Sequence, residues 1–147
     1  MAELTRKELI MLLNGAGRPR LAGVDLSSEN FRRLDFENAN MRGAVLQGAN
    51  IEEAILRNCN MTGVNMTRTR AAFADFANCN MTAANMTLAD LKGARLTDVT
   101  LTNTNLNGAN LENANMKGAK VDGVRFDEGT TWPDGKKGAA GNPNNYV

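Results

Sequence analysis

The ten residues NCNMTGVNMT at positions 58–67 return almost unchanged as NCNMTAANMT at positions 78–87, a shift of 20 residues. A finer period lies inside this repeat, because every fifth residue from Leu26 to Phe126 is apolar and only Ala71 in that series is small. Two positions before each of these centre residues, a second register is mostly small and apolar. Fixed repeats of this kind are typical of solenoids, in which each repeat packs only on its neighbours.

A step of five fits neither a helix nor a long strand. On a helix it walks around the surface, and on a strand it reverses the face at every repeat. The two apolar registers do alternate locally, so each unit can form one very short strand followed by a corner. If four units make one coil, residues 20 apart in the sequence lie above one another at a strand spacing of about 4.8 Å. The period therefore predicts an all-β solenoid.

Folding the chain into four sides sorts its residues into columns. The centre residues become continuous apolar stacks, which read Leu26, Leu46, Met66, Met86, Leu106, Phe126 on one side and Phe36, Leu56, Phe76, Leu96, Met116 on another. Asparagine columns, such as Asn40, Asn60 and Asn80, are expected to form amide ladders between coils and to bond to nearby backbone at the corners. Opposite charges also stack, as Arg32 over Glu52, Arg33 over Glu53, Glu37 over Arg57, Asp75 over Arg95 and Lys92 over Glu112.

The units ADLKG (89–93), ANLEN (109–113) and ANMKG (114–118) resemble the consensus A-(D/N)-L-x-x of the pentapeptide-repeat proteins. The resemblance covers residues 24–128, about five coils, and suggests a cyanobacterial-type member. It implies a right-handed quadrilateral β-helix with the centre residues inside. We divide the chain into a helical cap and lead-in at 1–22, a β-helix at 23–128 and a C-terminal cap segment with a disordered tail at 129–147.

Both ends of such a stack need caps, because their open backbone would otherwise recruit other strands. Thr5 and Glu8 have the spacing of a capping box, which predicts a short α-helix over about 6–14 with Leu9, Leu12 and Leu13 on its apolar face. The sequence around Trp132 resembles the segment that follows the last coil in many cyanobacterial members of the family. We expect Trp132 to be the lid of that end.

The pattern breaks at RTRAAFADFAN, residues 68–78, where Ala71 replaces a large centre residue and Phe73 falls at an outward position. Two interpretations remain open. Phe73 either swings inward through a local bulge and fills the space beside Ala71, or it is exposed. In the second case Arg68, Arg70 and Phe73 form a candidate protein-contact patch. Val45, Ile55 and Leu88 are further apolar residues in outward registers, and they fall on more than one face.

The composition offers no means of catalysis. The chain lacks histidine and any phosphate-binding loop or zinc spacing, so we expect no catalytic, cofactor or metal site. Cys59 and Cys79 are expected to be small core residues rather than a disulfide. A net charge of +1 argues against nucleic-acid binding. Without a long apolar stretch or a secretory signal, we expect a cytoplasmic protein without membrane contact.

A rigid rod with flat walls suits protein–protein contact. The first hypothesis is a non-enzymatic scaffold or regulator that binds another protein and is more readily a monomer than a dimer. The alternative, implied by the family resemblance, is a DNA mimic that inhibits or protects DNA gyrase. Against it, the charge columns alternate in sign and no apolar dimerisation helix follows Phe126.

Overall fold

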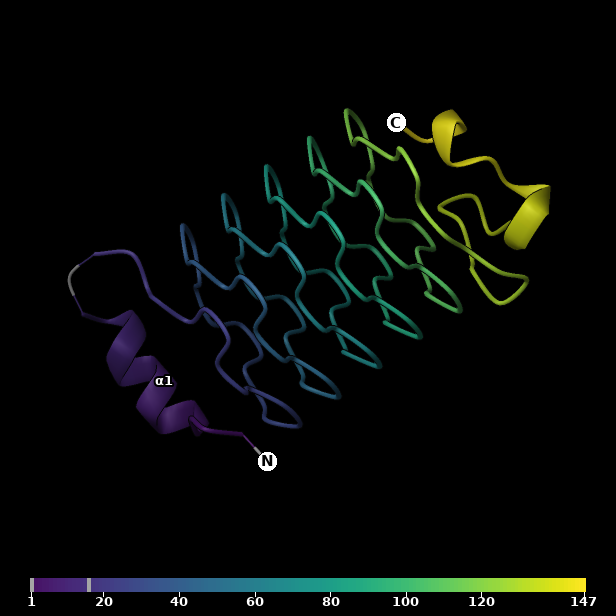
Figure 1. Ribbon diagram of the computed structural model, residues 1–147. Helices are drawn as coiled ribbons and strands as arrows, with labels where there is room; N and C mark the ends of the chain where they lie inside the picture. The colour runs from purple at the N-terminus through teal and green to yellow at the C-terminus, as the bar shows by residue number, and fades with distance from the viewer. Residues whose placement is uncertain (1, 16) are drawn as a thin grey trace.

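A computed structural model describes residues 2–15 and 17–147. Helix α1 (Arg6–Leu13) lies across one end of a stack of coils, and the short 3₁₀ helices η1 (Gly138–Ala140) and η2 (Pro143–Asn145) lie at the other end (Figure 1). Every fifth residue from Arg20 onward forms a parallel bridge with the residue 20 positions later, up to Asn105 with Arg125. The bridges stay single, and in the described residues they form no longer strand. The predicted right-handed quadrilateral β-helix is confirmed.

The unit 61–65 shows why five residues suffice for one side of a coil. Backbone N–H groups that lose water must find acceptors, and here all five do. Two donate to the next coil, one closes a turn, one donates to the previous coil, and one is capped by a side chain. In order, these bonds are Met61 N to Asn80 O (2.7 Å), Gly63 N to Thr82 O (2.9 Å), Val64 N to Met61 O (3.1 Å), Asn65 N to Ala44 O (3.0 Å) and Thr62 N to Asn60 Oδ1 (3.2 Å).

The asparagine columns act within coils rather than between them. Asn60 Oδ1 accepts from the backbone N–H and the hydroxyl of Thr62, and Asn80 Oδ1 accepts the same pair of bonds from Thr82. The predicted bonding to nearby backbone is confirmed. The predicted amide ladders are wrong, because across residues 2–15 and 17–147 no amide side chain bonds to the amide above or below it. Each Oδ1 already accepts the backbone N–H of the residue two positions later, which donates to no neighbouring coil.

The centre residues form one continuous apolar core along the axis, and Leu26, Phe36, Leu56 and Phe76 are fully buried. Threonine side chains in the small inner register are buried as well, and each donates a hydrogen bond to a backbone carbonyl. Thr69 Oγ1 donates to the carbonyl of Leu46 at 2.7 Å, and Thr104 Oγ1 donates to Met81 at 2.9 Å, each to a centre residue 23 positions earlier. The thiols of Cys59 and Cys79 make the corresponding bonds to Phe36 (3.1 Å) and Leu56 (2.7 Å).

Helix α1 begins with the predicted capping box. Thr5 accepts from the N–H of Glu8, and the Glu8 carboxylate accepts from the N–H of Thr5 at 2.8 Å. Leu9 is fully buried against the first coil, whereas Leu12 is 45% exposed, so its place on the predicted apolar face is wrong. The helix is too short to span a membrane, and no other described segment is a longer helix. The stacked coils begin at Arg20, slightly before the predicted boundary.

The C-terminal end is closed by aromatic rings, as predicted. Trp132 is fully buried, and its ring meets Phe126 edge-on at 5.2 Å between centroids. Its indole N–H donates to the carbonyl of Gly138 at 2.8 Å. The predicted disordered tail is wrong, because Tyr146 stacks on Trp132 at 5.7 Å and donates its hydroxyl to Asp134 at 2.9 Å. These contacts order residues that composition alone assigns to disorder.

Candidate protein-binding wall

The patch predicted from the sequence lies on one side of the coil. We call this side the Phe73 wall and define it by its five stacked segments, 28–33, 48–53, 68–73, 88–93 and 108–113, which follow one another at the 20-residue register. Arg68, Arg70 and Phe73 are all exposed on its middle segment, with Arg68 and Phe73 at the two corners that bound it. The predicted patch residues therefore share one wall.

Phe73 points outward, and the bulge interpretation is wrong. The bridges from Asn50 to Arg70 and from Arg70 to Asp90 keep the 20-residue register through this segment. Ala71 stays at the centre position and is buried, and the Phe73 side chain is 63% exposed. Its ring lies against Gly93 in the next coil, where a Cβ atom would overlap the ring. The absence of a side chain at Gly93 makes room for the ring on the surface.

Phe73 also occupies a strained backbone position. Its φ of 59° lies in the left-handed region, which costs a non-glycine residue about 1–2 kcal/mol. Leu88 repeats the arrangement on the same wall, with a φ of 57°, 49% exposure and a contact with Gly108. The turn position of both residues is more commonly glycine or asparagine along this chain. The wall thus holds two bulky apolar residues where neither backbone conformation nor burial favours them.

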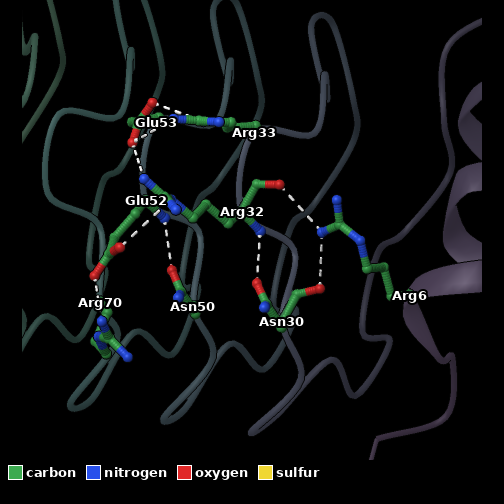
Figure 2. A network of polar contacts seen from close by, with 8 residues as sticks. All are labelled: Arg6, Asn30, Arg32, Arg33, Asn50, Glu52, Glu53 and Arg70. Carbon is green, nitrogen blue, oxygen red and sulfur yellow. Dashed lines mark hydrogen bonds and ion pairs between the residues drawn. The ribbon is translucent and has the colours of Figure 1, made fainter.

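An ionic network fills the N-terminal half of the wall (Figure 2). Glu52 and Glu53, from the second segment, lie between arginines of the segments on both sides. Arg33 contacts Glu53 at 2.8 Å, Arg70 contacts Glu52 at 2.7 Å, and Arg32 reaches both carboxylates. Because these pairs are exposed, each contributes little to stability. Their effect is to neutralise both carboxylates.

Hydrogen bonds from Arg33 and then Arg32 hold the pKa of Glu53 below its usual range. Arg68 makes no ion pair with any residue of 2–15 and 17–147. The N-terminal half of the wall is therefore paired and nearly neutral. Beyond it, the Arg68 guanidinium, without an ion pair to any described residue, lies near exposed apolar side chains, and Lys92 pairs with Glu112.

The 20-residue register of the sequence predicts part of this site but not all of it. All five charge pairs predicted from the 20-residue register are present. The Arg70–Glu52 pair was missed, because it is diagonal and joins residues 18 positions apart. Leu88 was noted only as an outward apolar residue. The sequence signal for Leu88 was the glycine 20 positions later, Gly108. Phe73 has the same signal in Gly93.

The two cysteine thiols lie in the core rather than on the wall. Contact with Cys59 and burial raise the pKa of the Cys79 thiol, which keeps it protonated. Both cysteines are free and buried. Within residues 2–15 and 17–147, no three histidine, cysteine or carboxylate side chains gather in a way that would hold a metal ion.

Comparison with known families agrees with the repeat geometry. The model of the pentapeptide repeat region matches residues 29–111, more than half of the chain. The chain belongs to the pentapeptide-repeat family. Its corners, bridges and centre residues are therefore those of a pentapeptide-repeat solenoid. No curated protein sequence matches the chain.

Several solved pentapeptide-repeat structures are similar to this chain. HetL of the cyanobacterium Nostoc sp. strain PCC 7120, involved in regulating heterocyst differentiation, is 19% identical, with a TM-score of 0.48 over 83% of this chain and 82% of HetL. Rfr23 of the cyanobacterium Cyanothece 51142 is 28% identical, with a TM-score of 0.39 over 77% and 87%. QnrB1, a plasmid-mediated fluoroquinolone resistance protein, is 19% identical, with a TM-score of 0.36 over 74% and 77%.

Proposed function

We propose that this protein is a non-enzymatic scaffold or regulator that binds another protein through the Phe73 wall. The observation that carries the proposal is the exposed Phe73 ring, held in a left-handed turn on the same wall as Arg68 and Arg70. Aromatic and arginine side chains are enriched in the centres of protein interfaces. A rigid wall also loses little conformational freedom on binding, which favours affinity.

The bulk of Phe73 supports the same interpretation. Twelve other described non-glycine residues take the same left-handed turn, among them the smaller Asn78 and Ala83, so the turn itself does not call for an aromatic ring. Gly63 occupies the turn position of Phe73 two units earlier without strain from a side chain. The fold therefore has no need of phenylalanine at position 73. We propose that this side chain serves a contact outside the chain.

The charges of the wall indicate the chemistry of the partner. Glu52 and Glu53 are paired, whereas Arg68 is exposed and has no described ion-pair partner. A complementary surface would offer a carboxylate to Arg68 and an apolar side chain to Phe73 and Leu88. We propose a partner segment that is acidic and apolar.

The charges do not favour the alternative of a DNA mimic. Such a mimic needs carboxylates that remain negative and face solvent, and on the Phe73 wall Glu52 and Glu53 are neutralised by arginines and Glu112 is paired with Lys92. We expect no inhibition of gyrase supercoiling at micromolar protein. Inhibition at that concentration would favour the mimic over the scaffold.

The direct test is quantitative affinity capture from native cell extract, followed by mass spectrometry. The wild type is compared with Phe73→Ser, with Arg68→Ser, and with Asn103→Ser as the matched control. Asn103 has a φ of 57° at the same turn position, half a coil away from the Phe73 corner. We expect a partner that the first two variants lose and the control retains, with unchanged circular dichroism. Equal capture by all four proteins would refute the wall as the binding site.

A further inference from the structure

The N-terminal end of the solenoid has backbone acceptors without a preceding coil to bond them. Inside the stack, the carbonyls of Ile55 and Arg57 form a pair that accepts two N–H groups from the coil before. Phe36 N donates to Ile55 O at 2.7 Å, and Asn38 N donates to Arg57 O at 2.9 Å. The same pair on the first coil consists of the carbonyls of Asp35 and Glu37, 20 residues earlier. No coil precedes them.

The neighbouring side of the first coil shows how a side chain can replace that missing coil. The carbonyls of Asn30 and Arg32 form the corresponding pair there. Arg6 of helix α1 donates one guanidinium nitrogen, Nη1, to both, at 3.0 Å to Asn30 O and 3.1 Å to Arg32 O (Figure 2). One guanidinium therefore matches the spacing of a carbonyl pair in this fold. Charged donors also make stronger hydrogen bonds than neutral ones.

The Asp35–Glu37 carbonyl pair has no such donor among the described residues. None of the residues in 2–15 and 17–147 donates a hydrogen bond to either carbonyl. Both residues line a hollow of about 360 Å³ between α1, the segment leading into the coils, and the first coil. Ile10, Leu13, Pro19 and Leu34 form its apolar part.

The carboxylates of the two residues add negative charge at the same place. Asp35 Oδ1 accepts the N–H of Glu37 at 2.8 Å, and the Glu37 side chain is 3.6 Å from Arg57. Arg57 lies in the second coil and is shared with Asp75 at 3.9 Å, so it offsets only part of this charge. The hollow thus combines two backbone acceptors, acidic side chains and an apolar lining.

We propose that this hollow is a receptor for the guanidinium of an arginine carried by a partner protein. The guanidinium would occupy the Asp35–Glu37 carbonyl pair as Arg6 occupies the neighbouring pair. The methylene stem of the arginine would lie along Leu13 and Leu34, since such stems cover apolar surface while the head stays polar. Arg6 on the neighbouring pair is the observed precedent for a guanidinium at such a site. The site is separate from the Phe73 wall and does not depend on it.

The test is a titration of ¹³C,¹⁵N-labelled protein with N-acetyl-arginine amide, followed through the carbonyl carbon shifts of Asp35 and Glu37. We expect these shifts to move and saturate, and N-acetyl-citrulline amide, which has the same shape without charge, to leave them unchanged. The variants Asp35→Asn and Glu37→Gln should weaken the arginine response several-fold. Equal responses to arginine and citrulline would overturn the proposal.

Two further variants test whether the probe recognises a carbonyl pair and whether the chain's own arginine occupies the hollow. Arg6→Ala opens the Asn30–Arg32 pair, whose carbonyl shifts should then also respond to the probe. If the Asp35 and Glu37 carbonyls stay silent, the proposal fails, whether or not the opened pair responds. Arg18 stands in the lead-in segment between Gly17 and Pro19, which both line the hollow. If binding appears only in Arg18→Ala, the occupant is the chain's own arginine and the proposed partner is wrong.

Discussion

Units 61–65 and 71–75 have the same backbone and very different surfaces. Both make their parallel bridge at the fifth residue, through Asn65 and Asp75. Both turn through a left-handed residue at the third position, which is Gly63 with a φ of 67° in one and Phe73 with a φ of 59° in the other. The comparison teaches that the inward registers and the turn fix the fold. The outward positions can then carry a recognition surface, even at some cost in strain.

The largest effect should come from breaking the inward register. Phe76 is fully buried, so Phe76→Ala removes a ring from the apolar axis and should lower the free energy of unfolding by about 3–5 kcal/mol. Urea denaturation followed by circular dichroism measures this change. A loss below 1 kcal/mol would mean that the axis repacks freely and that the inward register does not set the fold.

A pair of glycine variants isolates the contact beneath Phe73. Gly93→Ala and Gly63→Ala place the same methyl group at left-handed turn positions of similar φ. Only the first meets an obstacle, because a Cβ at Gly93 overlaps the Phe73 ring whereas a Cβ at Gly63 has open space. We expect Gly93→Ala to destabilise the protein by about 1–3 kcal/mol more than Gly63→Ala in urea denaturation. Equal losses would show that the ring does not rest on Gly93.

A smaller effect is expected from the buried hydroxyl of Thr69. Thr69→Val keeps the shape and removes the donor to the Leu46 carbonyl, so unfolding free energy should fall by about 0.5–1.5 kcal/mol. Thr62→Val is the surface control, because the Thr62 hydroxyl bonds to Asn60 at an exposed site. Equal or smaller loss at position 69 would contradict the role of this buried bond.

The smallest effect concerns the ionic network of the wall. Because Arg33 and Arg32 lower the pKa of Glu53, folding favours its ionised form. That contribution is present above the pKa of an unfolded glutamate, about 4.3, and is lost as pH falls through the lower folded value. Wild type should therefore lose more stability than Glu53→Gln on acidification across this range. Parallel pH profiles in thermal unfolding would show that the network contributes nothing.

Much of this architecture could be predicted because it depends on one period. A centre residue every five positions and a return after 20 place Leu26, Leu46 and Met66 in one column without further information. The capping box of α1 was predictable because it depends on local residues alone. The lid formed by Trp132 was expected from its resemblance to the family and confirmed by its burial.

What could not be predicted depends on contacts outside that period. The last coil gains one residue, so that Asn110 bridges to Thr131 at a spacing of 21 rather than 20, and Asp127 accepts from the N–H of Gly108 and Gly129 there. The tail is ordered by one aromatic stack, which composition does not reveal. The direction of Phe73 was ambiguous because it depends on whether the register slips at Ala71, and neighbouring coils prevent that slip.

The most direct test of the central claim is the free energy of unfolding of Phe73→Gly, measured beside its capture of a partner. If the fold is set by the inward registers, glycine relieves the left-handed backbone and loses only a surface contact. Stability should then stay level or rise by about 1 kcal/mol while partner capture disappears. A loss of several kcal/mol would contradict this account, because it would make Phe73 part of the structure rather than of the surface that recognises a partner.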